Sequence, residues 1–141
     1  MRSTDMKIAL VLTDSSTECR KSLEMLKSFA DSFSADIEVF VVLEDLYRLE
    51  SASVSLGVPL PPDTIKNAKE RAKNRVKTLW RHVVNDESAQ IEIKTIAGEL
   101  AQEALKFVDE EKPDLLLWGC QPTATLCRVI DEVKVPSLII K

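Results

Sequence analysis

Residues 6–13 have the sequence MKIALVLT, a nearly continuous run of apolar and β-branched side chains. Such a run is typical of a strand that is buried on both faces, and strands of this kind occur mainly in parallel sheets. Asp14 and Ser15 follow the strand directly, and Ser15 together with Glu18 forms a capping-box pattern that predicts the start of a helix. The beginning of the chain therefore predicts a buried strand followed closely by a helix.

The same alternation of strand and helix patterns continues to the end of the sequence. Apolar residues at helical spacing predict helices in the stretches that contain residues 19–33, 63–84, 100–112 and 124–133. Further apolar or alternating runs predict strands at residues 37–43, 91–96, 115–118 and 137–141. Elements in this order predict an α/β fold, a doubly wound parallel sheet of five strands in a three-layer sandwich.

The carboxyl ends of these strands are the expected place for a ligand. In open parallel sheets, ligands bind in the crevice beyond the carboxyl ends of the strands. The strand ends of this sequence lie at Thr13–Asp14, Leu43–Glu44, Ala97–Gly98 and Gly119–Cys120. Asp14 is therefore a candidate ligand-binding side chain, and capping of the first helix beside Ser15 is its alternative role.

The composition excludes several kinds of site. The 141 residues carry a formal net charge of −4 and include three glycines, Gly57, Gly98 and Gly119, which are too far apart for a Walker A loop or a G-x-G-x-x-G fingerprint. The single histidine, His82, excludes most zinc-dependent and histidine-based chemistries. No residues supply a nucleophile, a base and an orienting group together. The sequence therefore predicts neither a catalytic centre nor a metal site.

The cysteines and the apolar segments indicate the compartment. Cys19, Cys120 and Cys127 are an odd number without a C-x-x-C spacing, so no disulfide framework is expected. Reduced thiols in a cytoplasmic protein are the simplest interpretation. The sequence shows neither a signal-peptide pattern nor a run of apolar residues long enough to cross a membrane. Residues 6–141 are predicted to form one domain, and Met1–Asp5 a polar tail.

Four segments carry a family resemblance through their order and spacing. They are KIALVLTDSS at residues 7–16, EVFVVLED at 38–45, KPDLLLWGC at 112–120 and KVPSLIIK at 134–141. Together they resemble the universal stress protein family over nearly the whole chain. The resemblance implies a flavodoxin-like sheet with the strand order 3-2-1-4-5. It also implies a homodimer that is formed partly through the last strand, Ser137–Lys141.

One branch of that family binds ATP at the carboxyl ends of strands 1, 2 and 4, and the resemblance implies which residues match. Asp14, with Thr13 beside it, would lie by the adenine or the ribose. Val42 would offer backbone hydrogen bonds to the adenine. Gly119, followed by Cys120, would begin the phosphate motif G-x2-G-x9-G-[S/T].

The phosphate motif fails after its first glycine. Pro122, Glu132 and Val133 stand where the motif has Gly, Gly and Ser or Thr. A phosphate cradle needs consecutive backbone N–H groups that face the anion, and Pro122 has none to offer. The sequence therefore predicts a vestigial or altered nucleotide site, in a branch of the family without the usual ATP site.

Three functions remain open. The preferred one is a cytoplasmic regulatory or interaction protein, dimeric, without catalysis, cofactor or ordinary ATP binding. The second is an adenine-nucleotide switch in which Asp14 and Val42 hold the adenosine and Arg128 or Ser137 replaces the missing glycines. The third is a thiol redox sensor that acts through Cys120, because Cys19, in the first turn or two of the first helix, is expected to face the same crevice.

Two further segments bear on partners. The connection Asp45–Pro62 is long and too rich in apolar residues for an idle loop. It is expected to be a lid over the site, a surface for a dimer or another protein partner, or a cover for the sheet edge. The helix at 63–84 is locally basic, which most often marks a solvated face. A nucleic-acid partner is not predicted, since the aromatic residue among these charges, Trp80, belongs to the apolar stripe of the helix.

Overall fold

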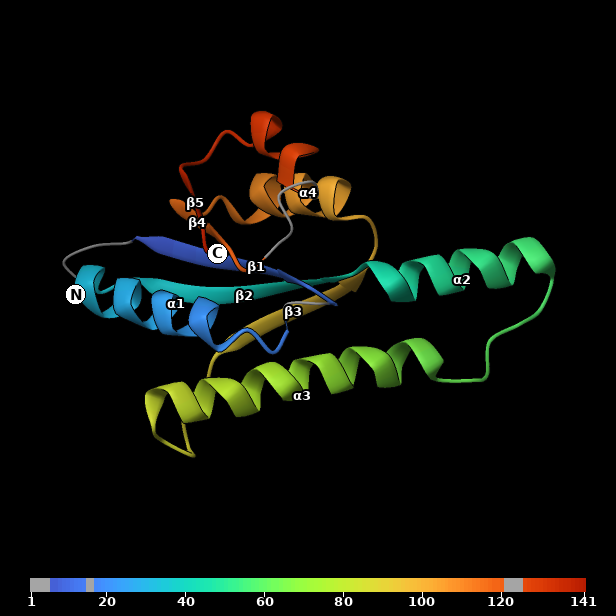
Figure 1. The fold of residues 1–141 in the computed structure, drawn as a ribbon, viewed down its shortest axis with the longest axis horizontal. Helices are drawn as coiled ribbons and strands as arrows, with labels where there is room; N and C mark the ends of the chain where they lie inside the picture. Colours follow the sequence, from blue (N-terminus) through green and yellow to red (C-terminus); the bar gives the residue numbers. More distant parts are fainter. Residues whose placement is uncertain (1–5, 15–16, 121–125) are drawn as a thin grey trace.

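The computed structural model describes residues 6–14, 17–120 and 126–141, and five strands in these residues form one parallel sheet. The strands are β1 (Lys7–Thr13), β2 (Asp36–Leu43), β3 (Glu92–Ala97), β4 (Leu115–Trp118) and β5 (Ser137–Ile139). They lie in the order β3-β2-β1-β4-β5 (Figure 1). The predicted doubly wound sheet and the strand order implied by the resemblance are both confirmed. The segment Met1–Asp5 lies outside the described residues.

Helices cover both faces of the sheet (Figure 1). Helices α1 (Arg20–Phe33) and α3 (Thr64–Val84) lie on one face, and α4 (Leu100–Glu111) and the 3₁₀-helix η2 (Ile130–Glu132) lie on the other. None of the helices in the described ranges is long and apolar enough to cross a membrane.

The strand β1 contributes to two apolar cores at once. Its even-numbered residues pack with α1 and α3, in a cluster that includes Ile8, Leu10, Leu12, Leu23, Leu26, Val76 and Trp80. Its odd-numbered residues pack on the side of α4, in a cluster that includes Ala9, Val11, Phe40, Leu100, Phe107 and Trp118. Because both faces of β1 are covered, its sequence is apolar almost without interruption.

The first helix begins later than the capping-box pattern predicts. Helix α1 starts at Arg20 with Cys19 as its N-cap, and Ser15 lies outside the described residues. The hydroxyl of Thr17 donates a hydrogen bond to the carbonyl of Asp14 at 3.3 Å. Thr17 and Glu18 form a turn ahead of α1, and local bonds of this kind compete with helix formation. Cys19 is therefore placed at the start of the helix rather than one or two turns inside it.

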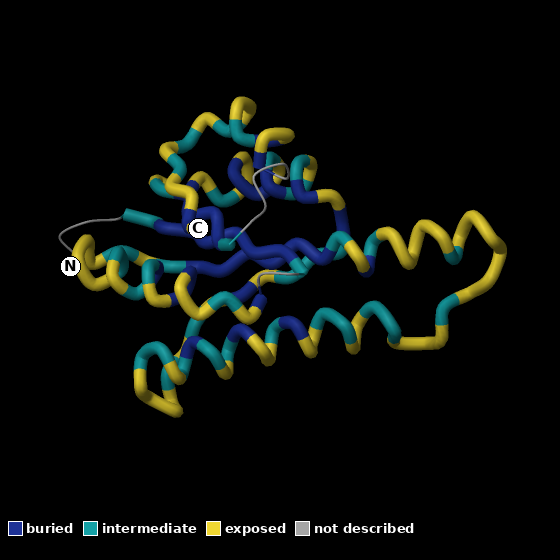
Figure 2. The backbone as a smooth tube through the Cα atoms, viewed as in Figure 1, coloured by how far each residue is buried: buried dark blue, intermediate teal, exposed yellow. Residues whose placement is uncertain are grey.

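The segment Asp45–Pro62 is largely helical rather than an open connection. Helix α2 (Glu44–Leu56) begins directly after β2 and ends at Gly57, whose φ of 68° is left-handed. It projects away from the sheet beside the N-terminal half of α3, and most of it is exposed (Figures 1 and 2). Leu46 is the buried residue of α2. The interpretation of this segment as a cover for the sheet edge therefore explains only a small part of its apolar side chains.

The helix predicted at 124–133 is shorter in the part that the structure describes. Successive bonds from Val129 N–H to the Leu126 carbonyl and from Glu132 N–H to the Val129 carbonyl have 3₁₀ spacing, and η2 covers Ile130–Glu132. Leu126 and Val129 are buried. Residues 124 and 125 lie outside the described ranges.

Candidate functional site

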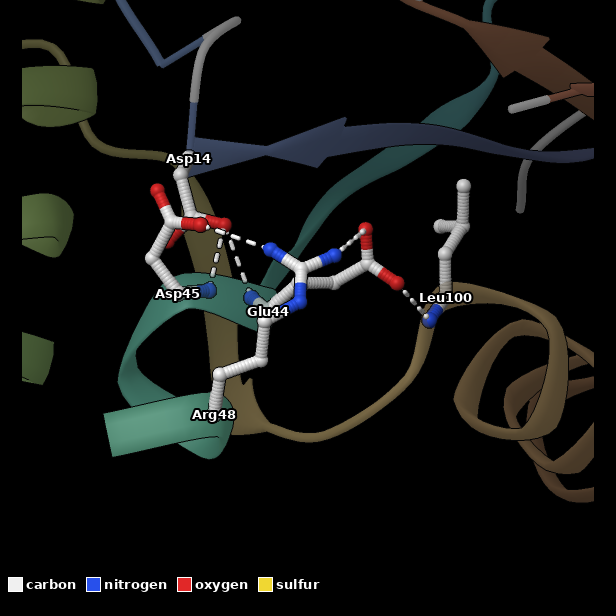
Figure 3. A network of polar contacts seen from close by, with 5 residues as sticks. All are labelled: Asp14, Glu44, Asp45, Arg48 and Leu100. Atoms are coloured by element: carbon white, nitrogen blue, oxygen red, sulfur yellow. Dashed lines mark hydrogen bonds and ion pairs between the residues drawn. The ribbon is translucent and has the colours of Figure 1, made fainter. Parts of the chain in front are cut away.

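Asp14 follows β1 and binds the first turn of α2 (Figure 3). Its Oδ2 atom accepts hydrogen bonds from the backbone N–H groups of Glu44, at 2.7 Å, and of Asp45, at 3.2 Å. The first N–H groups of a helix have no partner within it, and Leu43 at the N-cap of α2 offers no side-chain bond. The carboxylate of Asp14 therefore caps α2, where the helix dipole also favours a negative charge. Asp14 caps α2, whereas the alternative role expected from the sequence was to help Ser15 cap the first helix.

Glu44 repeats this arrangement one strand further along the sheet. Its Oε2 atom accepts a hydrogen bond from the backbone N–H of Leu100 at 2.9 Å, at the start of α4 (Figure 3). The N-cap residue of α4, Glu99, makes no side-chain cap bond. Arg48 lies 3.9 Å from Glu44 Oε1 and donates to Asp45 Oδ1 at 2.8 Å. The carboxylate of Asp14 thus ties the end of β1 to the start of α2, and the carboxylate of Glu44 ties the start of α2 to the start of α4. The guanidinium of Arg48 contacts Glu44 and Asp45 within α2.

The sequence marks Glu44 as the residue after the second strand, at an expected ligand-binding end, but it assigns no role to Glu44 or to Arg48. A signal was present, because Glu44 follows β2 as Asp14 follows β1, and Arg48 is four residues after Glu44 on the same helix. The sequence does not indicate which group each carboxylate binds. Asp14 and Glu44 bind backbone groups 30 and 56 residues further along the chain, respectively.

Thr13 and Val42 lie side by side at the same end of the sheet. Thr13 pairs with Val42 in the β1–β2 register, and Val42 pairs with Ile96 on β3. Both residues are buried, with exposed fractions of 5% for Thr13 and 0% for Val42. The structure therefore brings Thr13, Asp14 and Val42 together, as expected from the resemblance.

Gly119 stands where α1 approaches β4 most closely. A Cβ atom at this position would lie 2.5 Å from Ser22 Oγ and 2.6 Å from Leu12 Cδ2. The N–H of Gly119 is already bonded to the carbonyl of Val11, at 3.0 Å. This one remaining glycine of the phosphate motif is therefore explained by packing. Pro122, the first departure from the motif, lies outside the described residues.

A small polar pocket lies beside the network of Figure 3. Its volume is about 220 Å³, and it is lined by Glu44, Tyr47, Arg48, Glu99, Ala101 and Arg128. Arg128, which was expected as a replacement for the glycines, is thus placed next to Arg48. Ser137, the other expected replacement, lies at the amino end of β5 opposite Leu116, and its hydroxyl donates to the Val135 carbonyl at 3.1 Å. The structure does not bring Ser137 to the pocket.

Cys19 and Cys120 form a disulfide bond in the structure, so the expectation of reduced thiols is wrong for this pair. Their Cα atoms are 6.4 Å apart although 101 residues separate them in sequence. Sequence spacing offered no sign of the pair, because the fold alone places the start of α1 beside the end of β4. Cys127 is a free, exposed cysteine.

Helix α3 carries the basic residues at the edge of two open grooves. The groove between α2 and α3 has a volume of about 730 Å³, and Lys66, Lys69 and Lys73 contribute to its lining. His82 is exposed and borders a second groove together with Arg71 and Arg75. Within the described part of the chain, no group of three or more His, Cys, Asp and Glu side chains is placed to hold a metal ion.

Known proteins resemble this chain in sequence and in fold. The family model described as "Universal stress protein family" matches residues 6–140. A universal stress protein from Aquifex aeolicus is 36% identical over 137 residues, which cover 96% of this chain and 100% of the relative.

Two solved structures with low sequence identity share the fold. The universal stress protein from Archaeoglobus fulgidus in complex with dAMP has a TM-score of 0.63 and 18% identity, over 96% of this chain and 98% of the other. A universal stress protein family protein from Arabidopsis thaliana with AMP bound has a TM-score of 0.56 and 16% identity, over 96% and 91% of the two chains. Both structures hold an adenine nucleotide.

Proposed function

Because this chain belongs to the universal stress protein family, we propose that it is a homodimeric regulatory protein of the cytoplasm that does not bind ATP in the usual way. The proposal rests on Asp14, whose Oδ2 atom already holds the first turn of α2. Gly119 likewise leaves room for α1. Two residues that would contact a nucleotide in the ATP-binding branch thus have structural uses in this chain. The same chain lacks the later glycines of the phosphate motif.

Contact with other proteins is the proposed mode of regulation, and α2 offers the surface. Leu49, Val54, Leu56 and Val58 are exposed on α2 and just after it, with fractions of 49%, 78%, 76% and 61%. Apolar side chains gathered on a projecting element commonly mark an interaction site. The groove between α2 and α3 adds lysine side chains to this surface.

The proposed homodimer uses the edge of the sheet at β5. Within the described residues, β5 pairs only with β4, so its outer edge presents unpaired backbone groups. Leu138 and Ile139 are exposed there, at 37% and 43%. A second copy that adds its own β5 would cover both.

The absence of ordinary ATP binding is tested by isothermal titration of the full chain with ATP and Mg²⁺. We expect no binding in the micromolar range, because the carboxylate of Asp14 is engaged and the glycine cradle is missing. Micromolar binding that weakens in Asp14→Asn would contradict the proposal. Asp45→Asn is the matched control, since Asp45 is an exposed carboxylate in the same network but not at the strand end.

A second candidate function is the binding of a nucleoside monophosphate, and the pocket beside Arg128 favours it. Arg48 and Arg128 both line a pocket of about 220 Å³, together with Glu44 and Glu99. Most small-molecule sites have volumes of roughly 300–1,000 Å³, so this pocket fits a phosphate group better than a whole nucleotide. Guanidinium groups bind phosphate oxygens in a bidentate manner, which would replace the missing backbone N–H groups.

The second candidate predicts a thermal shift with AMP that ATP does not exceed. Saturating AMP should raise the melting temperature by a few degrees, through binding to the folded state alone. Adenosine should have a smaller effect, and Arg128→Gln should abolish the difference between the two. Arg71→Gln on α3 is the control. A flat response to adenosine, AMP and ATP would exclude this function and leave the first one standing.

A further inference from the structure

The two paired cysteines lie at a place where the fold is arranged to bring them together. Cys19 is the N-cap of α1, and Cys120 follows Gly119 just after β4. Their Cα separation of 6.4 Å falls within the about 4.4–6.8 Å that disulfides require. A bond here joins the first helix to the end of a central strand, across most of the length of the chain.

The backbone at Cys120 is held in place by neighbouring strands. The N–H of Gly119 donates to the Val11 carbonyl at 3.0 Å, and the N–H of Cys120 donates to the Ile140 carbonyl at 3.1 Å. Cys120 has a φ of 37°, a left-handed conformation that non-glycine residues rarely adopt. Since a side chain at position 119 would collide with Ser22, the close approach of Cys120 to α1 also depends on Gly119.

The surroundings of Cys19 favour its thiolate form when the bond is open. A thiolate at the N-terminus of a helix is stabilised by the helix dipole, and α1 has 14 residues. Ser22 Oγ donates to Cys19 Sγ at 3.2 Å and lies 3.3 Å from Cys120 Sγ, so one hydroxyl contacts both sulfurs. Both cysteines are partly exposed, which leaves them open to a small thiol.

We propose that Cys19 and Cys120 form a reversible redox couple that exchanges with a low-molecular-weight disulfide and fixes the end of β4 to α1. The Cys19 thiolate attacks the external disulfide, breaks its S–S bond and releases one thiolate. The Cys120 thiolate then attacks Cys19 Sγ in the mixed disulfide and releases the second external thiolate. The two released thiolates take up the protons that the two cysteine thiols lose on ionisation. Two electrons pass to the external disulfide, which is reduced to two thiols. This site goes beyond the proposed function and does not depend on a nucleotide.

The compartment determines whether this bond is permanent or reversible. The proposed function, on which this step rests, places the chain in the cytoplasm, where thiols are kept reduced and disulfides are generally transient and redox-sensing. The bond closes a loop of about 100 residues, and cross-links of long loops restrict the unfolded chain most strongly. We therefore expect oxidation to raise the melting temperature by roughly 10 °C, with the fold retained in both states.

The test equilibrates the full chain in glutathione buffers that range from reduced to oxidised, followed by acid quenching and alkylation. Peptide mass spectrometry should show Cys19 and Cys120 blocked together in reducing buffers and linked in oxidising ones, in step with the melting temperature. Cys127 should never be linked to either of them. Free thiols at Cys19 and Cys120 in the most oxidising buffer would overturn the proposal. So would a bond that survives dithiothreitol in the folded protein.

Variants separate a redox couple from two cysteines that only pack together. Cys19→Ser should abolish the redox-dependent melting shift, while Cys127→Ser should retain all of it. Cys19 is partly exposed at the N-cap of α1, a position that serine favours, so its serine variant is expected to fold. Ser22→Ala tests the positioning role of the hydroxyl through the pH dependence of the oxidation rate, which should move to higher pH. An unchanged pH profile would remove Ser22 from the proposal, and a melting shift retained in Cys19→Ser would overturn it.

Discussion

Replacing Asp14 with alanine is expected to lower the free energy of unfolding by about 2 kcal/mol. The substitution leaves the N–H groups of Glu44 and Asp45 without their acceptor and removes a negative charge from the start of α2. Hydrogen bonds to a charged group contribute about 1.5–3 kcal/mol each, and the partial exposure of Asp14 reduces that contribution. Urea denaturation followed by circular dichroism measures the effect.

The matched variants for Asp14 separate charge from hydrogen bonding. Asp14→Asn keeps an acceptor oxygen without the charge, so about half of the loss is expected. Asp45→Asn removes an exposed carboxylate that bonds only Arg48 among the contacts resolved here, and should change stability by less than about 0.5 kcal/mol. An Asp14→Ala variant as stable as the parent chain would show that α2 does not depend on this cap.

Replacing Ile139 with lysine is expected to convert the proposed homodimer fully into monomers. Ile139 lies on the outer strand β5 and is 43% exposed, so a charge there would be buried without a partner when a second β5 pairs with it. Multi-angle light scattering after size exclusion should give twice the chain mass of 15.8 kDa for the parent and 15.8 kDa for the variant.

The control for the dimer lies on α2. Val54→Lys places the same charge on another β-branched apolar residue, which is 78% exposed on the projecting helix α2. Its mass should remain that of a dimer. If Val54→Lys rather than Ile139→Lys produces monomers, the copies meet through α2 and the β5 interface is wrong.

The fold was predictable because its signals are local and repeated. The buried strands are apolar runs in the sequence, and the apolar residues of α3 recur with a clear helical period. The sequence therefore predicts these strands and α3 close to their observed bounds. Helix α2 was missed, since its apolar residues are mostly exposed and follow no buried stripe. The start of α1 was placed too early because Thr17 and Glu18 form a turn there, beside the bond from Thr17 to the Asp14 carbonyl.

The candidate site was predictable only in its location. The end of β1 and the end of β2 meet, as parallel strands require, and Thr13, Asp14 and Val42 lie together. The use of Asp14 and the pairing of Cys19 with Cys120 depend on contacts between residues 30 and 101 positions apart. Spacing along a single sequence carries no record of such contacts.

The cap on α2 has a consequence for any ligand that enters the crevice. A ligand that takes Oδ2 of Asp14 must first release the N–H groups of Glu44 and Asp45, so it competes with the helix for one oxygen atom. Such competition is reciprocal. If the ligand lowers the affinity of a partner that requires an ordered α2 by some factor, the partner lowers the affinity of the ligand by the same factor. The binding of a ligand to Asp14 and the binding of a partner at the far end of α2 are then linked through one equilibrium, the ordering of α2.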